Sequence, residues 1–190
     1  MPTRKPHFEE LINYWQTLPK TNENNVPCKT AFDPMQVAGL LPRLFFCEQM
    51  SKYNMHIRLM GETLDLAVGN AVPNRNVYES LPECDWSAAE LFYATLSAQP
   101  CAGHAARLVS VGNGLFYDMD AVMLPLTDRN CEASFYVGLA DTRQNHEKSV
   151  QAQFEAVDVT GFSTMEYWDL GYGLPRFEKK APLERFGLFH

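Results

Sequence analysis

Strand-like segments fall into two groups along this chain of 190 residues, and their spacing restricts how the chain can fold. Residues 43–50 and 53–61 carry the apolar runs typical of two paired strands. Residues 103–111, 115–126 and 131–140 carry three more. Neither two strands nor three can bury an apolar face without further cover. We therefore predict one antiparallel sheet of five strands, built from both groups.

The segment between the two groups is predicted to be helical. In the stretch HIRLMGETLDLAVGN, Gly61 ends the second strand, residues 62–68 have helical character, and Gly69 is suited to follow a helix. The longest predicted helix covers residues 86–98 and stops before Pro100. Helices laid across one face of the sheet would bury that face. The predicted fold class is therefore α+β.

An amphipathic helix is predicted near the N-terminus, over residues 7–18. It places four large apolar side chains on one stripe, and we predict them as interface residues: Phe8, Leu11, Ile12 and Trp15. An apolar helix face has to be buried against something. Two alternatives stay open: the stripe packs across the seam of a homodimer, or it covers the chain's own sheet.

Three parts are predicted along the chain. Residues 1–30 hold the N-terminal amphipathic helix and a polar linker, residues 31–142 hold the sheet and its helices, and residues 143–190 form a C-terminal extension. The extension is rich in aromatic residues, which argues against a purely solvated tail. It either wraps the central part or binds a partner.

Composition argues against several classes of protein. The net charge of −7 disfavours binding to a phosphate backbone, which needs clustered Lys and Arg. The five cysteines are scattered without metal-ligand spacing, so a reducing compartment fits better than a disulfide framework. No apolar run approaches the roughly 18 residues of a membrane span, and no secretory signal is recognisable. We predict a cytoplasmic protein that binds neither nucleic acid nor membranes.

Five short motifs, in this order and spacing, resemble a bacterial subfamily of PAS domains: YWQTLP, VPCKTAFDP, LLPRLFFCE, IRLMGETLDLAVGN and AVMLPLTD. The resemblance covers about residues 12–140. Lys29 stands where that subfamily usually has Arg, and Glu62 separates Gly61 from Thr63 where Gly and Thr are often adjacent. The resemblance implies a PAS-like five-stranded antiparallel sheet in the central part of the chain, with helices across one face and a cavity between the two layers.

The resemblance also implies that apolar side chains line this cavity. The predicted ligand-binding residues are Phe46, Ile57, Leu59, Leu64, Leu91, Phe92, Leu96, Tyr117, Met119, Met123, Phe135 and Val137. The alternative is that the same positions form a filled core that holds no ligand. The list depends on which strand face points inward, because a slip of one residue exchanges the two faces.

No catalytic or metal-binding motif occurs in the sequence, and the five histidines lack HxH or HExxH spacing. Haem-binding PAS domains commonly carry a histidine on the long helix, and flavin-binding ones a cysteine motif, but residues 86–98 have neither. We therefore predict no metal, no cofactor and no catalytic residue.

Three charged residues of the late strands leave alternatives open. Asp118 and Asp120 point to one face of a strand, and a solvated sheet face explains them more simply than catalysis does. Arg107 is exposed to solvent, paired with Asp118 or Asp120 across the hairpin, or buried where it binds the carboxylate of a ligand.

The main functional hypothesis is a non-catalytic, PAS-type sensory and regulatory protein. It acts through contacts with a protein partner or by self-association, and a small apolar ligand in the cavity modulates those contacts. The alternative is a stand-alone binder or carrier of an apolar small molecule. A remote alternative is an enzyme that uses Asp118 and Asp120.

Overall fold

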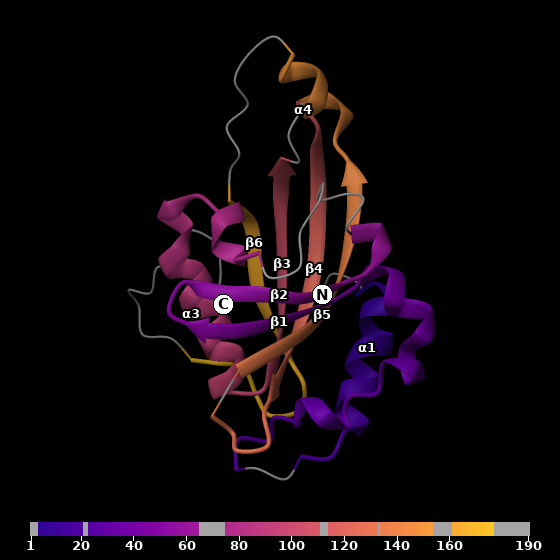
Figure 1. The fold of residues 1–190 in the computed structure, drawn as a ribbon, viewed down its shortest axis with the longest axis vertical. Coiled ribbons are helices and arrows are strands. Elements are labelled where there is room, and N and C mark those ends of the chain that lie inside the picture. The colour runs from indigo at the N-terminus through magenta and orange to yellow at the C-terminus, as the bar shows by residue number, and fades with distance from the viewer. Residues whose placement is uncertain are drawn as a thin grey trace.

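Six antiparallel strands form one sheet in the order β2-β1-β5-β4-β3-β6 (Figure 1). The computed structural model describes residues 4–20, 23–64, 75–110, 114–132, 134–153 and 161–176. The strands are β1 Leu44–Ser51, β2 Asn54–Met60, β3 Cys101–Ser110, β4 Phe116–Thr127, β5 Ser134–Gln144 and β6 Phe162–Asp169. The helices are α1 Pro6–Thr17, η1 Lys29–Ala31, η2 Pro34–Arg43, η3 Val77–Ser80, η4 Glu83–Asp85, α3 Trp86–Ala98 and α4 His146–Gln151.

The early and late strands lie in the same sheet, as predicted. β1 pairs with β5, from Leu44 opposite Leu139 to Glu48 opposite Phe135. β2 pairs with β1 on its other side and closes that edge of the sheet. The predicted α+β class with one antiparallel sheet is therefore confirmed.

The sheet has a sixth strand that the sequence analysis did not predict. β6 lies in the part described there as a C-terminal extension, and it pairs with β3, with Met165 opposite Ala105. Met165 is fully buried. Residues 162–169 thus complete the sheet beyond β3.

Helices cover both faces of the sheet. α1 and η2 lie on one face, which we call the α1 face, while α3, η3 and η4 lie on the other, the α3 face (Figure 1). The alternation of side chains along each strand gives every face its own hydrophobic core. The helices predicted to cross one face are those of the α3 face, and the N-terminal helix buries the opposite face.

The four side chains predicted for a dimer interface are buried inside the chain's own core. Phe8, Leu11, Ile12 and Trp15 are at most 3% exposed. The Trp15 Nε1 donates a hydrogen bond to the carbonyl oxygen of Pro125 at 2.8 Å. The open alternative, that this helix covers its own sheet, therefore describes the structure, because β4 and β5 provide the apolar face that the stripe needs.

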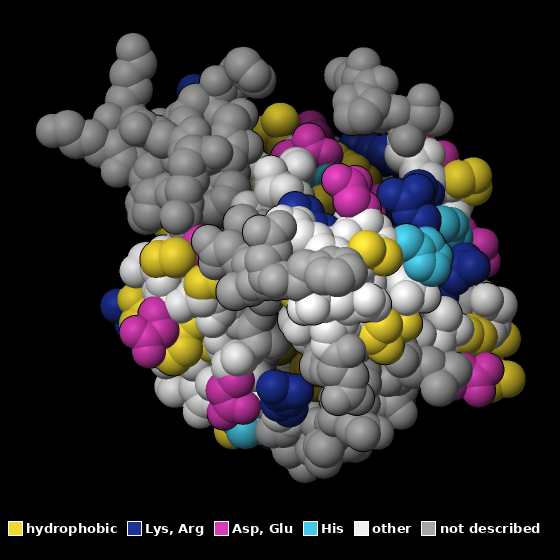
Figure 2. All heavy atoms as spheres, turned by 90° about the horizontal axis from the view of Figure 1, so that it is seen from above, with side chains coloured by type: hydrophobic (Ala, Val, Ile, Leu, Met, Phe, Trp, Pro, Cys, Tyr) yellow, Lys and Arg dark blue, Asp and Glu magenta, His cyan; other side chains and the backbone are white. Residues whose placement is uncertain are grey.

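Ion pairs fix the N-terminal end of α1 to the sheet. Lys5 Nζ lies 2.6 Å from a carboxylate oxygen of Asp120 and 2.7 Å from one of Asp141. His7 Nε2 lies 3.1 Å from Asp141. Viewed from above, the surface shows Lys and Arg, Asp and Glu, and His side chains beside one another (Figure 2). Opposite charges thus hold the helix where its apolar stripe ends.

Gly61 forms the corner at which the chain leaves β2. Its N–H donates to the carbonyl oxygen of Leu44 at 2.7 Å. A Cβ at this position would lie 2.2 Å from the carbonyl oxygen of Leu41 and 2.4 Å from that of Pro42. The close approach of two backbone segments therefore requires glycine. Helical structure begins at Glu62, but residues 65–68 of the predicted helix, and Gly69 after it, lie outside the described residues.

Candidate ligand-binding cavity

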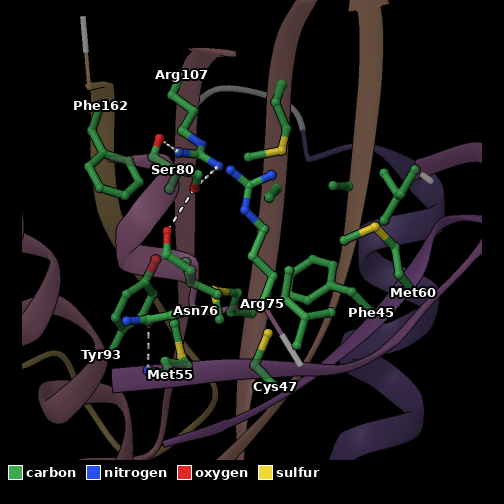
Figure 3. Close-up of a pocket in the computed structure, with 18 residues that line it drawn as sticks. Phe45, Cys47, Met55, Met60, Arg75, Asn76, Ser80, Tyr93, Arg107 and Phe162 are labelled. Atoms are coloured by element: carbon green, nitrogen blue, oxygen red, sulfur yellow. Dashed lines mark hydrogen bonds between the residues drawn. The ribbon is translucent and has the colours of Figure 1, made fainter. Parts of the chain in front are cut away.

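A cavity of about 100 Å³ lies on the α3 face, between the sheet and residues 75–80 (Figure 3). Its floor includes three alanines from neighbouring strands, since Ala105 of β3 lies opposite Ala121 of β4, which lies opposite Ala140 of β5. Small side chains in adjacent rows leave space that larger ones would fill. Phe45 and Met60 lie at one end and Phe162 at the other (Figure 3).

Four of the twelve predicted ligand-binding residues line this cavity: Ile57, Leu64, Met119 and Met123. Others pack on the α1 face, namely Phe46, Phe135 and Val137. Phe92 and Leu96 fill the core beneath α3, with Leu91 beside them. Leu59 is 48% exposed, and Tyr117 is half-buried outside the lining.

A slip of one residue explains the misplaced side chains of β1 and β5. In β1, Phe45 and Cys47 face the cavity, whereas Phe46 was predicted to face it. In β5, Ala140 faces the cavity, whereas Phe135 and Val137 were predicted to do so. Both strands are apolar on each face because both faces are buried, so alternation alone does not mark the inner one. The prediction of Phe46, Phe135 and Val137 as cavity residues was therefore wrong.

An irregularity in β2 explains the exposure of Leu59. Phe46 pairs with Leu59 but Cys47 pairs with Ile57, so the register shifts by one residue at Arg58. Ile57 and Met60 consequently both reach the cavity, although they are three positions apart. A β-bulge of this kind interrupts the alternation from which Leu59 was predicted.

Polar side chains gather at one part of the cavity wall. Arg107 of β3 donates from Nη1 to the carbonyl oxygen of Ser80 at 3.0 Å and from Nη2 to its Oγ at 3.1 Å (Figure 3). Its side chain is partly buried, and desolvation by the surrounding protein lowers the pKa of the guanidinium. Arg75 also lines the cavity and lies 3.9 Å from the carboxylate of Glu79.

The strand register decides among the three alternatives for Arg107. Arg107 lies opposite Met119, so it points to the α3 face. Asp118 and Asp120 alternate with Met119 and point to the α1 face. The alternative of a cross-strand ion pair with Asp118 or Asp120 is therefore excluded among the described residues, and Arg107 lies at the cavity.

Residues 75–80 connect the cavity to the β1–β2 hairpin. Asn76 lines the cavity, and its Oδ1 accepts a hydrogen bond from the backbone N–H of Met55 at 3.1 Å, while its Nδ2 donates to the carbonyl oxygen of Tyr53 at 3.0 Å. Tyr78 is fully buried and donates from its hydroxyl to Glu90 of α3 at 2.5 Å. Burial, together with this hydrogen bond, raises the pKa of Tyr78.

Residues 3–140, more than half of the chain, match the family described as PAS domain. The chain belongs to the PAS-domain family. A comparison with curated proteins found no match. The matched part of the PAS domain runs from α1 through most of β5 and ends before β6. The cavity lies between the helices and the sheet, as the resemblance implied.

The two aspartates of the remote enzymatic alternative are held in ion pairs on the α1 face of this PAS domain. Asp118 accepts from Arg143 at 3.3 Å and from Asn145 at 3.0 Å. Asp120 accepts from His104 and Lys5. Burial alone would raise the pKa of Asp120, but those hydrogen bonds and charges outweigh it and lower the pKa to about 2. A general acid needs the opposite shift.

The cysteines and acidic residues of the PAS domain form no metal site in the described parts of the chain. Cys47 lines the cavity, and burial raises the pKa of its thiol to about 12, so it is an uncharged apolar contact at neutral pH. No helix among the described residues combines the length and apolar character that a membrane crossing requires.

The alanines at the cavity floor are among the lining residues that the sequence did not predict. Ala105, Ala121 and Ala140 each stand out as small residues in an apolar strand. They leave space for the cavity because they are neighbours across the sheet, and the pairing of β3, β4 and β5 is needed to place them side by side.

Proposed function

We propose that this PAS-domain protein is a non-catalytic sensor, in which a small ligand in the cavity changes contacts with a protein partner. The observation that carries the proposal is the double role of residues 75–80. This segment forms one wall of the cavity through Asn76, Val77 and Ser80, and it also holds the β1–β2 hairpin. A ligand that contacts the wall would therefore act on the hairpin.

The hairpin is a suitable surface for the ligand-dependent partner contact, because it lies at the edge of the sheet and is held by few polar groups. The backbone N–H of Tyr53 donates to Glu90 of α3 at 3.2 Å, and the N–H of Ile57 donates to the carbonyl oxygen of Arg75 at 3.1 Å. A ligand shifts a conformational equilibrium only by contacting the two states differently. Displacement of residues 75–80 would change several of these hairpin contacts together.

The buried stripe of α1 bears on the kind of partner contact. Because Phe8 and Trp15 are inside the core, an interface through them would require α1 to leave the sheet. We therefore propose that the ligand changes the partner contact at the hairpin, and that α1 does not mediate self-association.

Replacing each of two neighbouring alanines by leucine tests the proposal, and the second replacement is the matched control. Ala105→Leu would fill the cavity, whereas Ala106→Leu places the same bulk on the next residue of β3, on the opposite face and beside an open hollow. Native mass spectrometry of protein isolated from its own host would detect a retained small molecule. Size-exclusion chromatography with light scattering and affinity capture would detect a second copy or a partner.

We expect the wild type and Ala106→Leu to retain the molecule and the partner, and Ala105→Leu to lose the molecule and bind the partner with altered affinity. A retained molecule without any partner would favour a stand-alone carrier. The proposal would be overturned if the wild type were a strict monomer without ligand and did not differ from Ala105→Leu in these measurements.

A further inference from the structure

The cavity combines an apolar interior with two cationic side chains. Phe45, Ile57 and Met123 contribute to the apolar interior, while Arg107 and Arg75 come from β3 and from the segment before η3. In Figure 3 the guanidinium groups of Arg75 and Arg107 extend toward the same region of the cavity. Two positive charges therefore lie beside an apolar space, with Arg107 partly buried and the Arg75 side chain 45% exposed.

The polar partners of Arg107 are neutral. Its two hydrogen bonds go to the carbonyl oxygen and the hydroxyl of Ser80, and it has no carboxylate partner among the described residues. A guanidinium has five N–H donors, so these bonds leave donors free. Arg75 has a single distant partner in the described parts of the chain, Glu79 at 3.9 Å. Within the described parts of the chain, the pair therefore carries more positive charge than its neighbours neutralise.

A carboxylate is the group that would complete this arrangement. A partly desolvated guanidinium is stabilised by an anion, and a planar carboxylate matches its fork of donors. The volume of about 100 Å³ is of the same order as that of an engineered apolar cavity of about 150 Å³ that holds benzene. The apolar part of a ligand that fits would therefore be compact.

We propose that the cavity binds a monocarboxylate with a compact apolar body, whose carboxylate lies between Arg107 and Arg75 and whose body lies over the alanine floor. This inference rests on the proposed function, because it assumes that the cavity is a ligand site. It adds the chemical class of the ligand and the residue that selects it.

Calorimetric titration of the wild type with matched probes tests the class of ligand. Benzoate and benzamide have the same ring and nearly the same shape, but only benzoate is charged. We expect benzoate to bind at least about 10-fold more tightly, because charge-assisted hydrogen bonds are stronger than neutral ones. Inorganic phosphate, which has charge without an apolar body, is expected to bind more weakly than benzoate.

Substitutions assign the selectivity to Arg107. Arg107→Met keeps the apolar stem, and we expect it to weaken benzoate binding about 10-fold or more while benzamide is little affected. Arg107→Lys keeps the charge without the planar fork and should be intermediate. Arg129→Met is the matched control, since Arg129 is exposed in the turn after β4, and it should change affinity by less than about twofold.

Equal binding of benzoate and benzamide would overturn the inference, as would unchanged benzoate affinity in Arg107→Met. Toluene distinguishes this failure from failure of the proposed function. If toluene binds the wild type but not Ala105→Leu, and benzoate does not bind, the ligand is neutral and the sensor proposal stands. If none of the probes binds, the inference fails and the proposed function loses its ligand site.

Discussion

The two faces of the sheet are built from the same strands but are packed differently. On the α1 face, Val122 and Leu139 are fully buried beneath Phe8 and Leu11. On the α3 face, the alanine row of β3, β4 and β5 leaves the cavity open. The difference indicates that side-chain size at neighbouring strand positions determines which face is filled and which contains a cavity.

Helix contacts differ between the faces in the same way. α1 inserts Trp15 into the sheet, and its indole nitrogen is hydrogen-bonded to the backbone of β4. Near the cavity, the corresponding cover is the segment 75–80, in which Asn76 and Ser80 make polar contacts and Tyr78 is fully buried. Each cover thus includes a buried aromatic residue, and the faces differ because the segment 75–80 lies over an open space.

The largest expected effect on stability comes from truncating one side chain on each face of the sheet. Trp15→Ala should lower the free energy of unfolding by about 3–5 kcal/mol, because it removes a fully buried side chain. Met119→Ala, which enlarges an existing cavity from a half-buried position, should cost about 1 kcal/mol. Urea unfolding measures both. Similar losses for the two variants would show that the faces are packed alike.

A second test addresses the corner at Gly61, where the chain leaves β2 beside the backbone of Leu41 and Pro42. Gly61→Ala should cost about 1–3 kcal/mol, because the added Cβ would lie against two backbone carbonyl oxygens. Gly39→Ala is the matched control, since a Cβ there meets nothing within 4 Å. Thermal unfolding of both variants measures the effect, and a corner that tolerates alanine as well as Gly39 does would contradict the structure.

A third test addresses the ion pairs that hold α1. The pKa of Asp120 is lowered from 3.8 to about 2, so its charge stabilises the fold above about pH 4, and this contribution disappears as the pH falls toward 2. Asp120→Asn should therefore lose about 1 kcal/mol at pH 7, a modest value because the side chain is 31% exposed.

The same variant should approach the wild type in stability near pH 2, where the wild-type carboxylate gains its proton. Urea unfolding across this pH range measures the convergence. A difference that stays constant with pH would show that the substitution acts through packing and not through charge.

The smallest expected effect concerns the exposed neighbour of that ion-pair network. Arg143 pairs with Asp118 at 3.3 Å, but its side chain is 85% exposed. Arg143→Ala should change the free energy of unfolding by less than about 0.5 kcal/mol, since solvent screens exposed pairs. Chemical unfolding measures this value. A loss as large as that of Asp120→Asn would mean that exposure does not separate the two pairs.

Sequence patterns predicted the elements of the central sheet well. The helix predicted over residues 86–98 coincides with α3, and the five predicted strands correspond to β1 through β5 with ends shifted by a few residues. Local signals were sufficient here, because Pro100 and the turn residues interrupt the apolar runs. β6 was missed, since its residues Phe162–Asp169 were considered only as an aromatic extension.

The sequence by itself determined that this chain forms an α+β, PAS-like sheet, because hydrophobic periodicity and chain breakers are local properties. Only the tertiary structure decided which strand face is the cavity, that Arg107 points into it, and that α1 covers its own sheet. These features depend on register, on one bulge near Arg58 and on pairing between distant strands. A one-residue shift reverses a face without changing the apolar pattern when both faces are buried.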